Sequence, residues 1–157
     1  MKVKRSYALD LNAVLANSVN NFEKPISGRF RYMVSNNLKV TGEERKAVIE
    51  AFPDDPAYIE FENRRITMLR EAGINSNEDI AKLTDEQRNE LEQKVLQLRD
   101  ECKEAIDAQT EIAKERDKFN EEEVELDLRT VPLSDVPNII AQDDWFVWEI
   151  LRPIVTE

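Results

Sequence analysis

Residues 84–119 read TDEQRNELEQKVLQLRDECKEAIDAQTEIAKERDKF, and this stretch decides the fold. Positions within it recur at alternating intervals of four and three residues, and we call this line the seam: Leu91, Val95, Leu98, Cys102, Ala105, Gln109, Ile112, Arg116 and Phe119. The spacing predicts one long helix that packs along a single line against another helix. A helix of about 35 residues is ~50 Å long at ~1.5 Å per residue. Because a small domain covers less than that length, we expect part of the seam to need a partner, either elsewhere in the chain or in another molecule.

The residues before the seam predict its first partner, a helix over residues 56–72. The sequence PDDP at 53–56 breaks the chain, after which Asp55 can cap a new helix whose first turn begins with proline. Gly73 suits the C-terminal cap of that helix. We therefore expect an antiparallel hairpin over residues 56–119 in which the shorter helix covers the first half of the seam.

The connection and the far end of this hairpin are also predicted. Residues 74–83 fit a small helical turn, and Thr84 with Gln87 forms a capping box that starts the long helix. Gln109 and Arg116 indicate that the second half of the seam is less deeply buried, because polar seam residues set register rather than add stability.

Residues 1–52 are predicted to form the N-terminal helices. Ser6 can cap the first, whose apolar positions are Leu9, Leu11, Val14, Leu15 and Val19. The second starts at Ser27 and carries an amphipathic stripe of Phe30, Met33, Val34, Asn37 and Leu38. Thr41 and Glu44 fit another capping box, which predicts that a separate short helix opens there.

Residues 120–157 form an acidic extended segment followed by a tail with two tryptophans. Residues 121–128, EEEVELDL, alternate acidic with aliphatic side chains, and a period of two indicates a strand or an extended segment. The best strand partner within the chain is Lys2-Val3-Lys4, which is basic where this segment is acidic. Asp143 can then cap a short helix that carries Trp145 and Trp148.

The composition agrees with two-faced helices. Hydrophobic residues make up 41% and charged residues 35%, and long helices with one buried line and a wide solvated face produce that combination. We predict a mainly α single domain over 1–157. Its expected architecture is an antiparallel helical hairpin or bundle with one long heptad-patterned helix and a short β or extended segment near the C-terminus.

Charge is unevenly distributed along the chain. The net charge is −11, yet residues 1–40 hold seven basic and two acidic residues, whereas residues 119–157 hold two basic and ten acidic residues. Two interpretations stay open: the two ends dock together, or two solvated faces meet different partners.

Catalysis and cofactor binding are not predicted. The chain has no histidine and one cysteine, which removes the commonest general base and any Cys/His zinc site. Glycine loops that hold phosphate are absent too. The acidic run 121–127 can hold a divalent ion only weakly, because it lacks the loop that builds a cage, and we favour a solvated edge. We therefore expect no enzyme activity, no cofactor and no metal.

The single cysteine and the lack of long apolar runs bear on the compartment. Cys102 lies on the seam, where we favour a packing role over reactivity. One cysteine allows no internal disulfide, which favours a reducing compartment. The basic start Met1-Lys2-Val3-Lys4-Arg5 lacks the apolar core of a signal peptide, and no apolar run reaches the ~20 residues of a membrane span. The expected location is intracellular, without membrane association.

Two segments combine aromatic side chains with exposure. Arg29-Phe30-Arg31-Tyr32, preceded by Lys24, interleaves arginines with aromatics as nucleic-acid surfaces do. Helical spacing buries Phe30, however, so we favour a core position with a solvated face and expect no direct nucleic-acid binding. Trp145 and Trp148 fit either a binding hot spot or a clamp that fixes the tail to the helices, and we favour the clamp.

The chain resembles a family of small phage and prophage proteins of unknown function. The resemblance rests on KVKRSYAL at 2–9, SGRFRYMVSNNLK at 27–39 and VPLSDV at 131–136, and on the order of the parts between them. It implies a phage origin and a helical, non-enzymatic accessory role. It implies no particular site residues.

The leading hypothesis is a non-catalytic phage-type accessory protein that binds another protein, of the host or of the phage, through a helical surface. The candidate partner-binding residues are Gln109, Ile112, Arg116, Phe119, Trp145 and Trp148. Self-association along the seam as a homodimer is the simplest form of this idea. The alternatives are an acidic inhibitor that mimics DNA and blocks a host defence enzyme, and a virion or assembly component. The expected location is the cytoplasm of the bacterial host cell or the virion.

Overall fold

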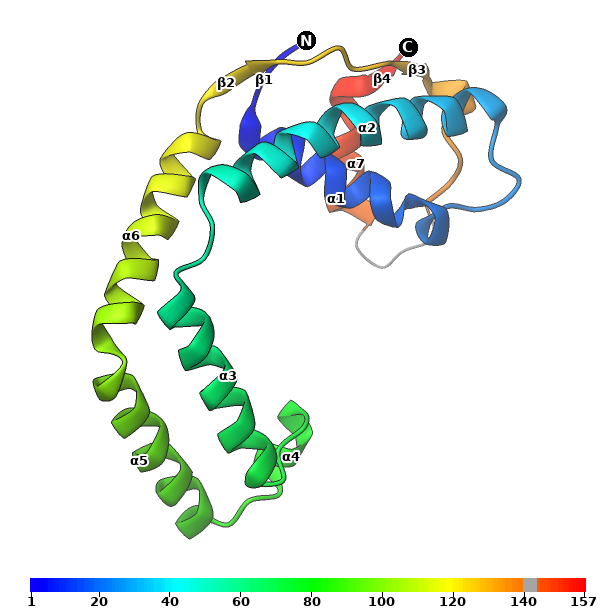
Figure 1. The fold of residues 1–157 in the computed structure, drawn as a ribbon. Helices are drawn as coiled ribbons and strands as arrows, with labels where there is room; N and C mark the ends of the chain where they lie inside the picture. The colour runs from blue at the N-terminus through cyan, green and yellow to red at the C-terminus, as the bar shows by residue number, and fades with distance from the viewer. Residues whose placement is uncertain (140–143) are drawn as a thin grey trace. The chain divides into compact units, whose positions relative to one another are not determined.

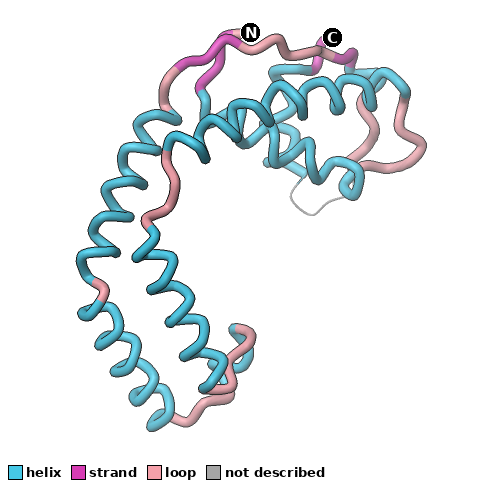
Figure 2. The backbone as a smooth tube through the Cα atoms, in the orientation of Figure 1, coloured by secondary structure: helices cyan, strands magenta, loops and turns pink. Residues whose placement is uncertain are grey.

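The computed structural model describes residues 1–139 and 144–157 and, for residues 18–21 and 144, the backbone alone. The chain divides into two compact units. Unit 1 comprises Met1–Ala51 and Arg116–Glu157, and unit 2 comprises Phe52–Glu115. Helices make up most of each unit (Figure 1), which confirms the mainly α class, and the strands of the described residues belong to unit 1 (Figure 2).

Unit 1 is built on a hairpin of two helices. Helices α1 (Arg5–Asn21) and α2 (Gly28–Ala51) lie side by side, and α7 (Asp144–Leu151) packs against α1 (Figure 1). Their apolar faces share one core with the end of the chain, made of Leu11, Val14, Leu15, Phe22, Phe30, Met33, Val34, Val131, Val147, Leu151 and Ile154. Burial of each large apolar side chain stabilises the fold by about 1.5–3 kcal/mol, so this core supplies most of the stability of unit 1.

Helix α2 corrects the prediction of a separate helix after residue 41. It runs unbroken through Thr41, which is fully buried. The Thr41 hydroxyl donates to the Asn37 carbonyl at 2.7 Å and accepts from Asn12 Nδ2 at 3.0 Å. Glu44 accepts a hydrogen bond from Arg5 Nε at 3.0 Å. The capping box does not form because both of its side chains bond to other partners.

The prediction that Ser6 caps the first helix is also wrong. Helix α1 begins at Arg5, and its cap position is Lys4, two residues before Ser6; the Lys4 side chain makes no capping hydrogen bond. Strand pairing in β1 (Lys2–Lys4) fixes the backbone up to this point, so the helix starts where the strand ends.

The start of the chain pairs with the acidic segment, as the sequence predicted. Strand β1 lies antiparallel to β2 (Glu123–Glu125), with Val3 opposite Val124 (Figure 1). Lys2 forms an ion pair with Glu123, and Lys4 donates to Glu121 at 2.6 Å. The hydrogen bond and charge of Glu121 raise the pKa of Lys4. The basic start of the chain therefore docks on the acidic segment.

The remaining elements of unit 1 bring the end of the chain onto the core. Strand β3 (Val131–Pro132) pairs in parallel with β4 (Val155–Thr156), and the short helices η1 (Leu133–Asp135) and η2 (Arg152–Ile154) adjoin them. The expected cap Asp143 and the side chain of Val19 lie outside the described residues.

Unit 2 contains most of the antiparallel hairpin predicted over residues 56–119 and ends at Glu115. Helix α3 (Pro56–Glu71) packs against α5 (Asp85–Glu101), and the short helix α4 (Asn77–Ala81) lies between them in sequence (Figure 1). The predicted caps form: Asp55 Oδ1 accepts from the Ala57 and Tyr58 amides, and Thr84 and Gln87 make the capping box. Gly73, at φ +78°, ends α3 in the left-handed conformation that favours glycine.

The seam continues through a break in the predicted long helix. At Cys102 the backbone leaves helical geometry (φ −105°, ψ 18°), so the stretch forms α5 and then α6 (Lys103–Asn120). The break lies where Arg64 of α3 donates to Glu101 at 2.8 Å and contacts the Cys102 Sγ at 3.7 Å. Every seam residue is nonetheless buried or half-buried, which confirms the direction in which the heptad pattern faces.

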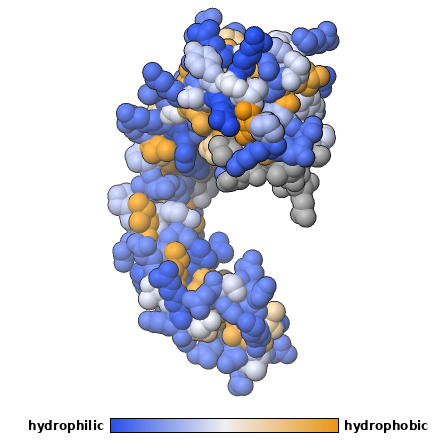
Figure 3. All heavy atoms as spheres, turned by 90° about the vertical axis from the view of Figure 1, so that its right-hand side faces the viewer, coloured by the Kyte–Doolittle hydropathy of each residue, from blue (hydrophilic) through white to orange (hydrophobic). Residues whose placement is uncertain are grey.

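Unit 2 has a thin core. Its buried apolar side chains are Phe61, Ile74 and Leu98, whereas Ile59, Ile66, Ile80 and Leu96 are exposed. Figure 3 accordingly shows small hydrophobic patches scattered among hydrophilic residues on the hairpin surface. The charged residues of the hairpin also form exposed ion pairs such as Glu90–Lys94, which contribute only ~0–1 kcal/mol each.

Candidate functional site

The two tryptophans lie beside an apolar groove on unit 1. Helix α7 turns Val147 and Leu151 into the core, and this leaves Trp145 72% exposed and Trp148 half-buried. The groove has a volume of about 660 Å³ and is lined by Leu133, Val136, Pro137, Asn138, Ile139, Trp145 and Trp148. We call these lining residues the Trp surface.

The part of the groove wall that residues 133–139 form is held in place by hydrogen bonds to the connection between α1 and α2. The Glu23 amide donates to the Asn138 carbonyl at 2.8 Å, and Asn138 Nδ2 donates to the Glu23 carboxylate at 2.8 Å. Ser27 Oγ donates to the Asp135 carbonyl at 3.2 Å. A wall fixed in this way loses little conformational entropy when a partner binds.

These positions bear on the two roles that the sequence left open for the tryptophans. Val147 and Leu151 fix the tail to the core, and Trp145 projects to the surface. Large aromatic side chains that are exposed beside an apolar groove are typical of binding hot spots. The sequence pattern does not single out Val147 as the anchor, because the two larger tryptophans beside it are the more prominent apolar residues.

A second hollow on unit 1 joins arginines from distant parts of the sequence. It measures about 310 Å³ and is lined by Gly28, Arg29, Tyr32, Met33, Arg129, Thr130, Val131 and Pro132. We call this cavity the basic hollow. One of its lining residues, Tyr32, is 66% exposed. Only the fold shows that Arg29 and Arg129 line the same hollow, because the two residues lie 100 positions apart in the sequence.

Asn37 sets the position of Arg129. Its Nδ2 donates to the Arg129 carbonyl at 2.9 Å, and its Oδ1 accepts from the Arg129 amide at 2.8 Å. The Asn37 side chain is fully buried and acts here as a peptide group would, pairing with both backbone groups of one residue. The extended segment is thereby attached to α2.

The seam candidates divide between the two units. Gln109 and Ile112 belong to unit 2, and Arg116 and Phe119 belong to unit 1. Gln109 is engaged inside unit 2, because its Oε1 accepts from the Asp55 amide at 2.9 Å and its Nε2 donates to Asp54 at 2.6 Å. Ile112 and Arg116 are half-buried.

Phe119 is covered from within unit 1 by Arg5. The Arg5 guanidinium carbon lies 3.6 Å from the centre of the Phe119 ring, and Arg5 Nη1 donates to the Phe119 carbonyl at 2.5 Å. Arg5 also pairs with Glu44 and Glu122, at 3.0 and 3.2 Å. Of the six candidate residues, Trp145 and Trp148 are therefore the two that the structure brings together on one open surface.

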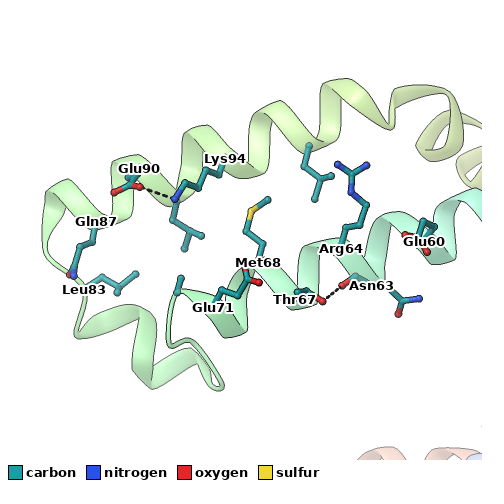
Figure 4. Close-up of a pocket in the computed structure, with 13 residues that line it drawn as sticks. Glu60, Asn63, Arg64, Thr67, Met68, Glu71, Leu83, Gln87, Glu90 and Lys94 are labelled. Carbon is teal, nitrogen blue, oxygen red and sulfur yellow. Dashed lines mark hydrogen bonds and ion pairs between the residues drawn. The ribbon is translucent and has the colours of Figure 1, made fainter.

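A groove also runs between α3 and α5 in unit 2 (Figure 4). It has a volume of about 770 Å³, and Met68, Leu83, Leu91 and Leu98 are its larger apolar lining residues. Polar and charged side chains such as Arg64, Glu71 and Lys94 form the rest of the lining. This groove is larger than the Trp surface but more polar, and it holds no large aromatic side chain.

The pKa of one titratable group near the core of unit 1, the hydroxyl of Tyr7, is shifted. Tyr7 donates from its hydroxyl to the Ile150 carbonyl at 3.0 Å, which ties α1 to the helix that carries the tryptophans. Burial raises the pKa of Tyr7 to about 12. The folded protein therefore favours the neutral form of the Tyr7 hydroxyl.

The acidic run 121–127 is used within unit 1. Glu121, Glu122 and Glu123 form ion pairs with Lys4, Arg5 and Lys2, respectively.

Within residues 1–139 and 144–157, no group of three or more His, Cys, Asp or Glu side chains is placed to hold a metal ion. No helix in these same ranges is both long enough and apolar enough to cross a membrane. No protein-family model, curated protein or solved structure matches this chain.

Proposed function

We propose that this protein works by binding another protein through the Trp surface, without catalysis. The observation that supports this most directly is the exposure of Trp145, 72% of which faces solvent beside an apolar groove. Tryptophan is enriched among the hot-spot residues of interfaces, whose truncation costs about 2 kcal/mol or more, roughly a thirtyfold change in affinity.

The shape of the site also favours a protein partner. The groove is open and mostly apolar, and its wall is held by the hydrogen bonds of Glu23, Ser27 and Asn138. Such a preformed surface accepts one or two large apolar side chains from a protein segment.

The setting of this proposal comes from the resemblance to small phage proteins. The three segments that carry the resemblance, 2–9, 27–39 and 131–136, all belong to unit 1, the unit that holds the Trp surface. We therefore propose a phage-type accessory protein that acts in the cytoplasm of the host bacterium or on the virion.

The DNA-mimic alternative has less support. A mimic needs carboxylates arrayed along a rod with few cations among them, because a duplex carries one charge per ~1.7 Å. Here Glu90, Glu101 and Glu111 each pair with a lysine or an arginine. The glutamates at 121–123 are paired as well, so lysines and arginines interrupt the acidic array along its length.

A capture experiment with two matched variants tests the proposal. Native protein, Trp145→Ala and Phe146→Ala are immobilised and exposed to extract from phage-infected bacteria. Phe146 is the control because it is 47% exposed on the same helix but does not line the groove. We expect a captured protein that is lost with Trp145→Ala and kept with Phe146→Ala. Equal capture by all three would refute a role for the Trp surface.

A parallel measurement tests whether the partner at the Trp surface is a second copy of the chain. Light scattering across a range of concentrations gives the mass of each variant. If the native protein dimerises and Trp145→Ala is monomeric, the partner at this surface is a second copy of the chain. If Trp145→Ala dimerises as the native protein does, the Trp surface is not the contact between copies.

A further inference from the structure

We infer that the partner presents an acidic segment next to large apolar side chains, and that the basic hollow binds its carboxylates while the Trp surface binds its apolar side chains. This inference rests on the proposed function and names the chemistry of the partner. It requires that the basic hollow can bind carboxylates and that one short segment can reach both sites.

The arginines of the basic hollow have binding capacity to spare. Arg29 is 80% exposed and Arg129 is 53% exposed, and each has one ion pair, with Asp135 and with Asp127, at 3.6 Å. Exposed pairs of that length contribute little. A guanidinium carries several N–H donors in a planar fork that suits a carboxylate, so both arginines can take a further anion.

The sequence around the hollow is basic in an otherwise acidic protein. The chain holds 33 acidic residues, yet none occurs between positions 24 and 42. That stretch supplies Lys24, Arg29, Arg31 and Lys39. Lys24 and these three basic residues of α2 therefore contribute a local positive field, which attracts acidic segments and repels basic ones.

The two sites lie along one continuous piece of chain. Residues 129–132 line the basic hollow, and residues 133–139 contribute to the Trp surface. Pro132 of the hollow is followed directly by Leu133 of the Trp surface, so the two sites adjoin and a short extended segment can reach both. Asn37 and Ser27 fix this piece of chain at two points, so the spacing between the sites is set before a partner arrives.

Acidic groups near the Trp surface disfavour a partner that is negatively charged along its whole length. Glu23 bonds to the groove wall at Asn138, and Glu149 lies four residues after Trp145 on α7. The surface is thus basic at the hollow and apolar to acidic at the tryptophans. A nucleic acid carries phosphate along its whole length and would meet these carboxylates and the net charge of −11. An acidic and apolar protein segment meets the basic end with its carboxylates and the apolar end with its large side chains.

Selection from a library of random twelve-residue peptides displayed on phage tests the inference. The targets are native protein, Trp145→Ala, the double variant Arg29→Ala with Arg129→Ala, and Arg45→Ala. Arg45 is the matched control, because it is an exposed arginine of α2 that neither lines the hollow nor belongs to the basic stretch 24–42. Circular dichroism checks that each variant keeps the native helix content.

The expected result is a set of peptides that place Asp or Glu beside large apolar residues. Their affinity should fall about tenfold or more with the double variant, should be lost with Trp145→Ala and should be unchanged with Arg45→Ala. Affinity for the double variant should also respond less to salt, because exposed charge contacts are screened.

The contrary outcomes separate this inference from the proposed function. Peptides that need Trp145 but show no acidic preference and bind the double variant normally would overturn the inference and leave the proposed function standing. Peptides that bind Trp145→Ala as well as native protein would overturn both. Binding of a single-stranded oligothymidylate that is lost with the double variant would replace the acidic segment with a nucleic acid.

Discussion

Arg5 joins three parts of unit 1, and its replacement by methionine is the sharpest test of how that unit is held together. The side chain is only 11% exposed. It donates to the Phe119 carbonyl, pairs with Glu44 and lies over the Phe119 ring. Methionine keeps much of the length and the apolar character of the stem but removes every one of these polar contacts.

The loss of stability expected for Arg5→Met can be estimated from the contacts that Arg5 makes. Hydrogen bonds that involve a charged group contribute about 1.5–3 kcal/mol each, and a cation over an aromatic ring adds ~0.5–2 kcal/mol. The pair with Glu122 adds little, because that carboxylate is 60% exposed. Glu44 is 23% exposed and regains some water when Arg5 is removed, which lowers the total. We expect Arg5→Met to reduce the free energy of unfolding of unit 1 by about 3 kcal/mol.

Urea unfolding followed by tryptophan fluorescence measures this change selectively. Both tryptophans, Trp145 and Trp148, belong to unit 1, so their emission reports on that unit and not on the hairpin. With a urea m-value of about 1.5 kcal/mol per molar, a loss of ~3 kcal/mol lowers the midpoint by ~2 M. Arg5→Lys keeps the charge but not the planar fork, and it should lose about half as much.

Arg45→Met is the matched control, because Arg45 is an exposed residue of α2 whose replacement should change stability by less than ~0.5 kcal/mol. If the midpoint of Arg5→Met moves no further than that of Arg45→Met, the argument that Arg5 links the ends of α1 and α6 is refuted.

Three further predictions concern single side chains. Asn37→Leu should destabilise unit 1 by about 2–3 kcal/mol in the same urea experiment, because it leaves the amide and carbonyl of Arg129 without partners; a loss below ~0.5 kcal/mol would contradict that role. In absorbance titration at 295 nm, one tyrosine should ionise near pH 12, and Tyr7→Phe should remove that step. Because the folded pKa of Tyr7 lies above its ordinary value of 10.0, stability should fall as pH rises from about 10 to 12, and an unchanged titration in Tyr7→Phe would argue against this assignment. Gln109→Ala should lower the stability of unit 2 by about 1–2 kcal/mol, measured by circular dichroism at 222 nm, and no change would mean that its bond to Asp54 contributes nothing.

Local signals in the sequence predicted local structure well. Asp55 before Pro56, and Thr84 before Gln87, are caps that need only their own neighbours, and both form. Thr41 looked the same in sequence, but it makes no cap, because Asn12 from another helix bonds to its hydroxyl inside a continuous α2. A capping motif predicts a helix start only where no distant residue competes for the side chain.

Pairing between distant segments was predicted only where charge made it evident. The acidic and aliphatic alternation at 121–128 matched Lys2-Val3-Lys4, and those strands pair. Nothing local links Arg129 to Arg29, since the link depends on Asn37, which reads in sequence as one position of an apolar stripe. Likewise, size alone pointed to the tryptophans as the anchor of the tail, whereas the smaller Val147 and Leu151 fill the space that the core of unit 1 leaves.

The most direct test of the central claim is a nuclear magnetic resonance titration with a peptide selected on the native protein. The two indole N–H groups, of Trp145 and Trp148, give separate signals in a spectrum of the ¹⁵N-labelled protein, and the amide of Phe61 reports on the buried side of the hairpin. We predict that the peptide shifts both indole signals in a saturable manner and leaves the Phe61 amide in place. Saturable shifts at Phe61 with unmoved indole signals would contradict the claim that this protein binds its partner through the Trp surface.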